Sequence, residues 1–227
     1  MISHRFEDAL ESYHRAYSPS PFMKTWVPRE KFVEVDFDNF GNISISREDD
    51  GIYGIAIGEK PSIPKSWGRF SIDSRAIRYL PLGITALGEW DAYWAPTLSG
   101  AQDVERKFSD SEIDTFLKTH APDSSVFPGN SEILEWVEIV KEDELAGVAA
   151  LCRWQSGFGV ISSVATHTNL RGQGVGKELM YRCLGAARIL DFAEVSLGVR
   201  HQNESAIRLY NSTGFTLMHN FTYCERR

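Results

Sequence analysis

A short glycine-rich segment, Arg171-Gly172-Gln173-Gly174-Val175-Gly176-Lys177, lies between a strand-like run and a helix-like run. Residues 159–166 are mostly apolar or small, and residues 176–190 repeat apolar side chains at helical spacing. Glycines let the backbone turn tightly and approach a ligand closely. The unpaired N–H groups of the first helical turn then attract negative charge, helped by the helix dipole. The order of strand, glycine turn and helix therefore predicts an anion-binding site.

Two common phosphate-binding motifs do not fit this segment. A Walker A loop has four residues between its first glycine and Gly-Lys, and Ser or Thr follows the lysine. Here three residues separate Gly172 from Gly176, and Lys177 is followed by Glu178. The dinucleotide motif G-x-G-x-x-G lacks its third glycine. A third pattern, Arg/Gln-x-x-Gly-x-Gly/Ala, is matched in full from Arg171 to Gly176.

A second pattern follows further along the chain. Residues 203–215 read Asn-x-x-Ala-x-x-Leu-Tyr-x-x-x-Gly-Phe, and a strand-like run over 193–199 lies between the two patterns. With both patterns in this order, the chain resembles the GNAT superfamily of acetyl-CoA-dependent N-acetyltransferases over about residues 105–227. Each piece alone also fits a structural role, as a tight turn, a helix N-cap at Asn203 or a core residue at Tyr210. The joint pattern carries the resemblance.

The part of the chain before the resemblance, residues 1–104, is predicted to form a small α+β extension, and it contains no chemical motif. Changes in apolar periodicity from helical to alternating place its elements. The predicted elements are a helix over 6–17, antiparallel strands over 32–37, 42–46 and 52–57, and a short helix over 86–94. Residues 96–100 are the best candidate linker.

Residues 105–227 are predicted to form the second domain. Ser109 and Glu112 have the spacing of a capping box at a helix start. The predicted strands are 104–108, 134–141, 145–154, 159–166, 193–199 and 215–223, and the predicted later helices are 176–190 and 203–213. The resemblance implies a central mixed sheet flanked by helices. The expected fold class is thus α+β with a mixed α/β sheet and an N-terminal α+β extension.

The resemblance implies that acetyl-CoA binds as a co-substrate. Its pyrophosphate would be held by backbone N–H groups of residues 172–177, and its pantetheine arm by the backbone of Val164 and Thr166. Arg171 either adds charge or positions the loop. The implied binding residues are Val164, Ala165, Thr166, Arg171, Gly172, Gln173, Gly174, Val175, Gly176, Lys177 and Asn203.

The resemblance also implies direct acetyl transfer to a primary amine in a ternary complex, with Tyr210 protonating the leaving thiolate. A lysine-like amine has a pKa near ~10.4, so lacking a base costs roughly 4 kcal/mol at pH 7. Many relatives carry a carboxylate on the strand before the loop, but residues 159–166 contain none. Glu138, on a neighbouring strand, is the first candidate for the base, followed by Glu135 and His201. Glu135 and Glu138 equally fit the solvent face of an alternating strand.

Three functions stay open on these residues. The first is an N-acetyltransferase acting on a small-molecule or peptide amine, and Tyr210 favours it. The second is a non-catalytic acyl-CoA-binding or regulatory module, which the missing carboxylate favours. In the third, residues 1–104 bind a partner and deliver a protein substrate to the following domain.

Composition limits the partners. The net charge of −7, without a basic stripe, argues against nucleic-acid binding. No apolar run is long enough to span a bilayer and no signal-peptide pattern begins the chain, so a cytoplasmic protein is expected. Cys152, Cys183 and Cys224 are expected to be reduced core thiols. His167 and His201 are interpreted as loop residues outside any metal-spaced cluster, so no metal is expected. A homodimer stays open.

Overall fold

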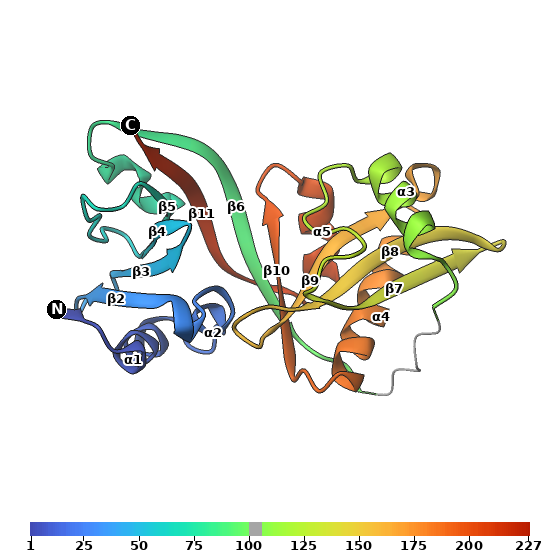
Figure 1. The fold of residues 1–227 in the computed structure, drawn as a ribbon, viewed down its shortest axis with the longest axis horizontal. Helices are drawn as coiled ribbons and strands as arrows, with labels where there is room; N and C mark the ends of the chain where they lie inside the picture. Colours follow the sequence, from blue (N-terminus) through green and yellow to red (C-terminus); the bar gives the residue numbers. More distant parts are fainter. Residues whose placement is uncertain (100–105) are drawn as a thin grey trace. The chain divides into compact units, whose positions relative to one another are not determined.

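The computed structural model describes residues 1–99 and 106–227 (Figure 1). The chain forms two compact units. The first unit comprises Met1–Ala92, Val199–Glu204 and Leu217–Arg227. The second unit comprises Tyr93–Gly198 and Ser205–Thr216. The predicted boundary between residues 104 and 105 lies outside the described residues.

The first unit contains a mixed sheet with two helices. Its elements are β1 (Ile2–Ser3), α1 (Phe6–Tyr17), α2 (Phe22–Trp26), β2 (Phe32–Phe37), β3 (Ile43–Asp49), β4 (Gly51–Ile57), β5 (Arg69–Asp73), most of β6 (Ile84–Pro96) and most of β11 (Thr216–Arg226), with 3-10 turns at Arg29–Lys31 and Ser74–Tyr79. The strand order is β1-β2-β3-β4-β5-β11-β6. Strands β1 to β4 pair antiparallel in sequence, β4 and β5 are parallel, and β5 and β11 are antiparallel. The predicted helix over 6–17 and the three predicted strands are confirmed.

Both faces of the first sheet are covered, because successive side chains along its strands point to opposite faces and are apolar on both. On one face, Tyr13 of α1 packs with Ile43 and Ile45 of β3, and all three are fully or almost fully buried. On the other face, the Trp67 indole lies over β4 and donates to Ser46 Oγ at 2.8 Å. A Cβ at Gly54 would lie 2.0 Å from that indole, so the glycine is needed for this packing.

One prediction for this part of the chain is wrong. Residues 86–94 form no helix and instead belong to strand β6. The apolar residues Ala86, Trp90 and Trp94 mimic helical spacing, but Trp90 and Ala92 alternate into the first-unit core. Trp90 stacks on Phe221 of the neighbouring strand β11, with ring centroids 5.0 Å apart. Tertiary pairing therefore overrides the local pattern.

The second unit is a mixed sheet between helices. Its elements are the end of β6, α3 (Asp110–His120), β7 (Ile133–Lys141), β8 (Glu144–Arg153), β9 (Gly159–Thr166), a 3-10 turn (Thr168–Leu170), α4 (Val175–Ile189), most of β10 (Glu194–Arg200) and most of α5 (Glu204–Ser212). The strand order is β6-β10-β9-β8-β7, with β7, β8 and β9 antiparallel and β9 and β10 parallel. The predicted mixed sheet flanked by helices is confirmed, and its strands and helices lie within a few residues of their predicted positions.

Helices α3 and α4 pack on the second sheet. Leu117 of α3 is buried with Trp136 and Val148. Helix α4 approaches β8 so closely that a Cβ at Gly147 would lie 3.1 Å from Val175 Cγ1. The predicted capping box at the start of α3 is confirmed, because Ser109 and Glu112 exchange both hydrogen bonds. The predicted strand over 104–108 is not found at residues 106–108, and its first two residues lie outside the described ones.

Candidate functional site

The predicted loop adopts the backbone that an anion site requires. Gly172 and Gly174 have φ values of +78° and +86°, in the left-handed region that glycine adopts without strain. Gly174 is the N-cap of α4, which begins at Val175. A Cβ at either glycine would meet nothing within 4 Å, so the loop opens toward solvent. The two glycines are therefore present for backbone conformation, with space left above them.

The start of α4 presents free hydrogen-bond donors. Among the described residues, the backbone N–H groups of Gly172 and of residues 174–177 have no acceptor. They include the N–H groups of the first helical turn, where the helix dipole favours negative charge. Gly176 has a different reason to be glycine: a Cβ there would lie 3.1 Å from Leu209 Cδ2 of α5. This close approach packs α5 against the beginning of α4.

The side chains of the loop mainly hold its shape. Arg171 Nη2 donates to the His120 carbonyl at the end of α3 at 2.8 Å, which favours the positioning role for this arginine. Gln173 Nε2 donates to the Asn169 carbonyl at 3.0 Å. The Lys177 ammonium lies 5.9 Å from the centroid of the Tyr181 ring. Arg171, Gln173 and Lys177 are exposed, so their remaining N–H groups face solvent.

Strand β9 contains a bulge just before the loop. Val148 pairs with Ala165 and Ala150 pairs with Ser162, so Ser163 and Val164 together oppose one residue of β8. Ser163 has φ +51°, which is uncommon for a residue with a Cβ. Its hydroxyl accepts from Val126 N at 3.0 Å and donates to Val126 O at 2.7 Å. These two bonds fix the bulge, and a bulge bends its strand.

Among the described residues, strands β9 and β10 are hydrogen-bonded to each other only near their starts. They pair in parallel at Gly159 with Val195 and at Val160 with Ser196, and among the described residues the register ends there. The backbone of Val164, Ala165 and Thr166 thus has no β10 partner. An extended, peptide-like ligand requires such an open strand edge.

Tyr210 lies in the buried face of α5. The residue is 6% exposed. The centroid of its ring lies 6.2 Å from that of Tyr93 and 5.8 Å from that of Phe215. Burial raises the pKa of Tyr210, so its hydroxyl stays protonated through the neutral range. Among the described residues, that hydroxyl has no hydrogen-bond partner. Its proton is thus available to a ligand.

Asn203 directly precedes α5, in a segment of the first unit. Its backbone N–H donates to the Arg200 carbonyl at 2.9 Å. This bond closes the turn between β10 and the helix. The role of Asn203 toward acetyl-CoA stays a prediction.

Glu138, the first candidate for the base, is buried at 2% exposure and bonds to the segment that leads into α3. Its carboxylate accepts from the backbone N–H groups of Lys107 and Phe108, at 2.9 and 3.4 Å. Trp136, two residues earlier on β7, packs in the same cluster as α3, so Glu138 points to that face of the sheet. These contacts give Glu138 a structural part, and its part as a base stays a prediction.

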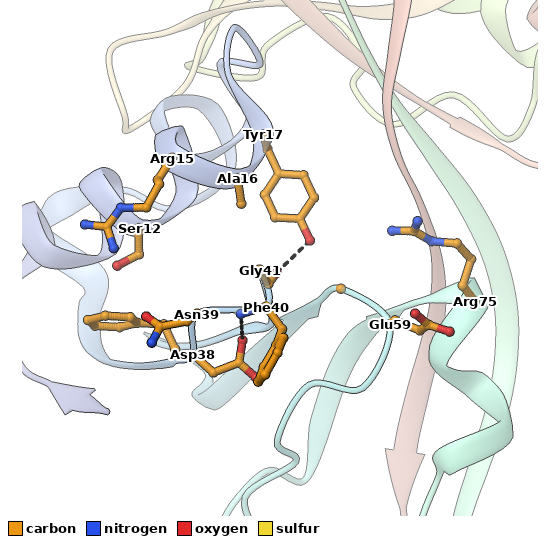
Figure 2. Close-up of a pocket in the computed structure, with 12 residues that line it drawn as sticks. Ser12, Arg15, Ala16, Tyr17, Asp38, Asn39, Phe40, Gly41, Glu59 and Arg75 are labelled. Carbon is orange, nitrogen blue, oxygen red and sulfur yellow. Dashed lines mark hydrogen bonds between the residues drawn. The ribbon is translucent and has the colours of Figure 1, made fainter.

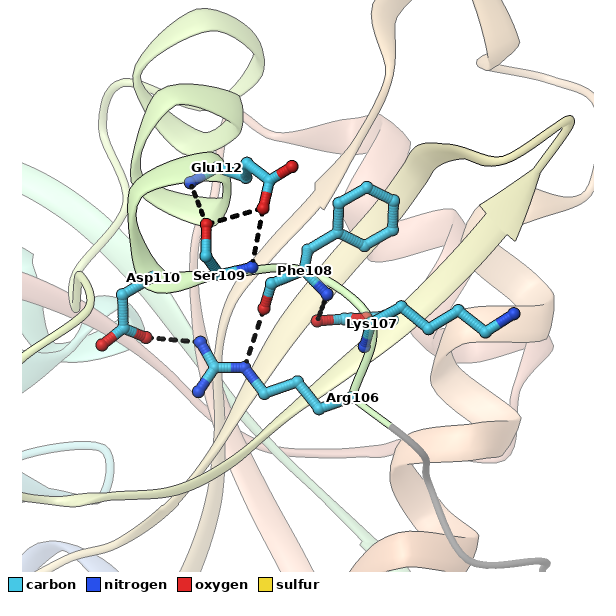
Figure 3. A network of polar contacts seen from close by, with 7 residues as sticks. Arg106, Lys107, Phe108, Ser109, Asp110 and Glu112 are labelled. Atoms are coloured by element: carbon cyan, nitrogen blue, oxygen red, sulfur yellow. Dashed lines mark hydrogen bonds and ion pairs between the residues drawn. The ribbon is translucent and has the colours of Figure 1, made fainter.

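The same network fixes the start of α3. Figure 3 shows Arg106 reaching the Phe108 carbonyl and the Asp110 carboxylate, beside the pair of Ser109 and Glu112. The hydrogen bond from Arg106 Nε to Phe108 O measures 3.0 Å. Two charged side chains, Arg106 within the segment and Glu138 on β7, therefore hold the chain that leads into α3.

The first unit contains a hollow of about 650 Å³ between α1 and the turn after β2 (Figure 2). Tyr17 donates to the Gly41 carbonyl across it at 2.7 Å, and Arg15, Glu59 and Arg75 stand at its rim. Arg75 is held by Asp73 through two bonds of 2.9 and 2.6 Å. None of the predicted site residues lines this hollow.

Sequence reasoning missed two features near the predicted residues. Ser163 carried no signal for a bulge, because its left-handed backbone and its bonds to Val126 depend on tertiary packing. Asp91 carried none either, because its partner His201 is 110 positions away in the sequence.

No helix of the described residues has the length and apolarity needed to cross a membrane. Within the same residues, no group of three or more His, Cys, Asp or Glu could hold a metal ion.

The model of the acetyltransferase (GNAT) family matches residues 101–215, which include the loop and Tyr210. The chain therefore belongs to the GNAT acetyltransferase family, and the resemblance drawn from the two patterns is confirmed. A curated relative is the L-methionine sulfoximine/L-methionine sulfone acetyltransferase of Salmonella typhimurium, which is 32% identical over 92 residues. That match covers 38% of this chain and 54% of the relative, so the chain spans about half the length of that protein.

Solved structures share the fold. A GCN5-related N-acetyltransferase from Sphaerobacter thermophilus has a TM-score of 0.59 and 13% identity, covering 100% of this chain and 95% of its own. One from Kribbella flavida has a TM-score of 0.54 and 14% identity, covering 97% and 95%. A GNAT-family protein from Novosphingobium aromaticivorans has a TM-score of 0.53 and 17% identity, covering 80% and 88%. At these identities the likeness concerns the fold.

Proposed function

We propose that this chain transfers the acetyl group of acetyl-CoA directly to a primary amine in a ternary complex. The observation that carries the proposal is the loop before α4, where two left-handed glycines open toward solvent above unpaired N–H groups. A pyrophosphate fits this chemistry, because it needs several donors and no side chain in the way. Membership of the acetyltransferase family supports the same donor.

Each part of the proposed site has a separate role in binding acetyl-CoA or in the transfer. The backbone of residues 172–177 binds the pyrophosphate, and the free edge of β9 at Val164 and Thr166 binds the pantetheine arm. The bulge at Ser163 keeps that edge away from a β10 ladder. Tyr210 protonates the thiolate that leaves, since burial keeps its hydroxyl protonated and no protein group described here competes for its proton. Acetyl-CoA supplies the activated acetyl group.

The acceptor is proposed as a small primary amine. The relative from Salmonella typhimurium carries methionine sulfoximine and methionine sulfone in its name, and both are α-amino acids. The match to it is partial, so these two compounds serve as first probes rather than as an assigned substrate. Peptides with a free N-terminus test the alternative acceptor class.

The test is acetyl-CoA-dependent thiol release with L-methionine sulfone, L-methionine sulfoximine and a short peptide with a free N-terminus. Mass spectrometry then identifies the acetylated amine. Thiol release matched by an acetylated product supports the proposal. Binding of acetyl-CoA with no product on any amine, beyond slow hydrolysis, would point to a non-catalytic acyl-CoA-binding module.

A further inference from the structure

The hollow between α1 and the turn after β2 is lined by residues of the first unit alone. Its volume of about 650 Å³ falls within the range of about 300–1,000 Å³ that is usual for ligand-binding pockets. The proposed acetyl transfer uses none of its residues. The side chains around the hollow indicate which kind of ligand fits it.

Arg75, at one side of the hollow, is held in place by a buried carboxylate. Asp73, on β5, is 4% exposed and accepts from Nε of Arg75 at 2.9 Å and from Nη2 at 2.6 Å. It also accepts from the backbone N–H of Arg75 at 3.1 Å, so the backbone and the side chain of this arginine are both fixed. A long side chain normally loses rotamer freedom when it binds a ligand, and this anchoring reduces that cost in advance.

The anchoring leaves one edge of the guanidinium free. A guanidinium carries five N–H groups in one plane, and Asp73 uses the edge formed by Nε and Nη2. The outer edge, formed by Nη1 and the second N–H of Nη2, has no partner among the described residues. The Arg75 side chain is 66% exposed, and Figure 2 shows it reaching toward the hollow. Two parallel N–H groups match the two oxygens of a carboxylate.

The acidic side chains beside the hollow are already engaged by the protein. Asp38 accepts from two backbone N–H groups and one side-chain amide of its own turn, at 2.8, 3.1 and 2.8 Å. Glu59 accepts from Arg78 Nη2 at 2.8 Å. A cationic ligand would have to compete with these donors, whereas the outer edge of Arg75 is open. The arrangement therefore favours an anionic ligand over an amine.

The turn after β2 supplies an apolar wall. The Phe40 side chain lines the hollow, and the residue is 91% exposed, so its ring is accessible to a ligand. Tyr17 of α1 donates to the Gly41 carbonyl at 2.7 Å and holds this turn beside the helix. Because Asp73 already balances the charge of Arg75, a bound carboxylate gains two hydrogen bonds and little from net charge. Apolar contact with Phe40 then supplies further affinity.

From these contacts we propose that the first unit binds a small organic carboxylate with an apolar group. The carboxylate lies on the outer edge of Arg75 and the apolar group against Phe40, and Asp73 is the positioning residue for Arg75. This binding goes beyond the proposed acetyl transfer and does not depend on it, since no residue of the hollow belongs to the proposed acetyl-CoA site.

The probe for this site is phenylacetate, compared with its neutral amide phenylacetamide, with acetate and with inorganic phosphate. Ligand-detected NMR on the chain of residues 1–227 measures the dissociation constant of each compound. We expect phenylacetate to bind about 10-fold more tightly than each of the other three, because it alone offers both a carboxylate and an apolar group.

Two variants test the two contacts separately. Arg75→Lys keeps a positive charge beside Asp73 but loses the planar fork, so phenylacetate binding should weaken about 10-fold. Phe40→Ala removes an exposed ring that belongs to no core cluster and should bring the affinity for phenylacetate close to that for acetate. Arg29→Gln is the control: its side chain is 63% exposed, it lies in the first unit outside the hollow, and its loss should leave binding unchanged. Thermal melting of each variant checks folding.

The outcomes separate this site from the proposed function. Unchanged phenylacetate binding in Arg75→Lys or in Phe40→Ala, or equal binding of phenylacetamide, would overturn the carboxylate site. Tighter binding of phosphate would overturn the ligand class. Absence of phenylacetate binding to the parent chain would overturn both. The measurement involves no acetyl-CoA and no turnover, so none of these results bears on the proposed acetyl transfer.

Discussion

At the scale of single residues, Gly174 tests the anion site. Gly174→Glu would place a side chain and a negative charge among the free N–H groups, so acetyl-CoA binding should be lost in a calorimetric titration. The left-handed backbone adds about 1–3 kcal/mol of strain to any non-glycine residue. Gly157→Glu is the matched control, because Gly157 likewise has a left-handed backbone, with φ +78°, as well as open space around a Cβ and a place in the second unit. Equal loss of binding in both variants would contradict the site.

Tyr210 is tested by removing one oxygen. Tyr210→Phe should lower kcat roughly 100-fold with little change in the KM for acetyl-CoA, because the proton moves only in the transition state. Stability should hardly change, since the hydroxyl has no partner among the described residues. Tyr181→Phe alters an exposed tyrosine on α4 and should behave like the parent chain. A kcat unaffected by Tyr210→Phe would remove this residue from the mechanism.

Glu138 is tested by charge removal at constant shape. Glu138→Gln weakens the bonds from the N–H groups of Lys107 and Phe108 to a buried carboxylate, so we expect unfolding to become easier by about 2 kcal/mol. The midpoint of thermal unfolding measures this loss. The pH dependence of kcat/KM should stay as in the parent chain. A flattened profile at unchanged stability would show instead that Glu138 handles the proton.

At the scale of elements, the bulge of β9 links packing to ligand binding. Ser163→Ala removes both bonds to Val126, at a cost of about 1–3 kcal/mol for each buried group left unsatisfied, and keeps a Cβ at φ +51°. Ser163→Gly removes the same bonds but relieves the backbone. We expect the KM for acetyl-CoA to rise more in the alanine variant, because the bulge geometry is then less favourable. Unchanged KM values in both would mean that the bulge does not shape the site.

The elements also show what the sequence could predict. Helices α1 and α4 were recognised because their apolar residues repeat at helical spacing, and the loop because glycine, strand and helix follow one another. Strand β6 was missed because Trp90 follows helical spacing in the sequence. Its place in a strand becomes apparent only from the tertiary packing, where it stacks on Phe221. The Asp91 and His201 pair was missed because no local pattern joins residues this far apart.

At the scale of the whole molecule, the last strand makes residues 105–227 dependent on the first unit. Strand β11 pairs with β5, and Phe221 and Cys224 are fully buried in clusters of that unit. A chain cut to residues 105–227 would expose both side chains and lose this pairing. We expect it to melt without cooperativity, as followed by circular dichroism, while the full chain melts sharply. A sharp melt with thiol release from the short chain would contradict this dependence.

Acetyl-CoA binding at the loop before α4 is the central proposal, and calorimetric titration of the chain of residues 1–227 tests it most directly. NAD and adenosine serve as controls, since NAD also carries a pyrophosphate and adenosine carries none. We expect saturable binding of acetyl-CoA at one site, with no heat from either control. Absence of acetyl-CoA binding, or equal binding of NAD, would contradict it.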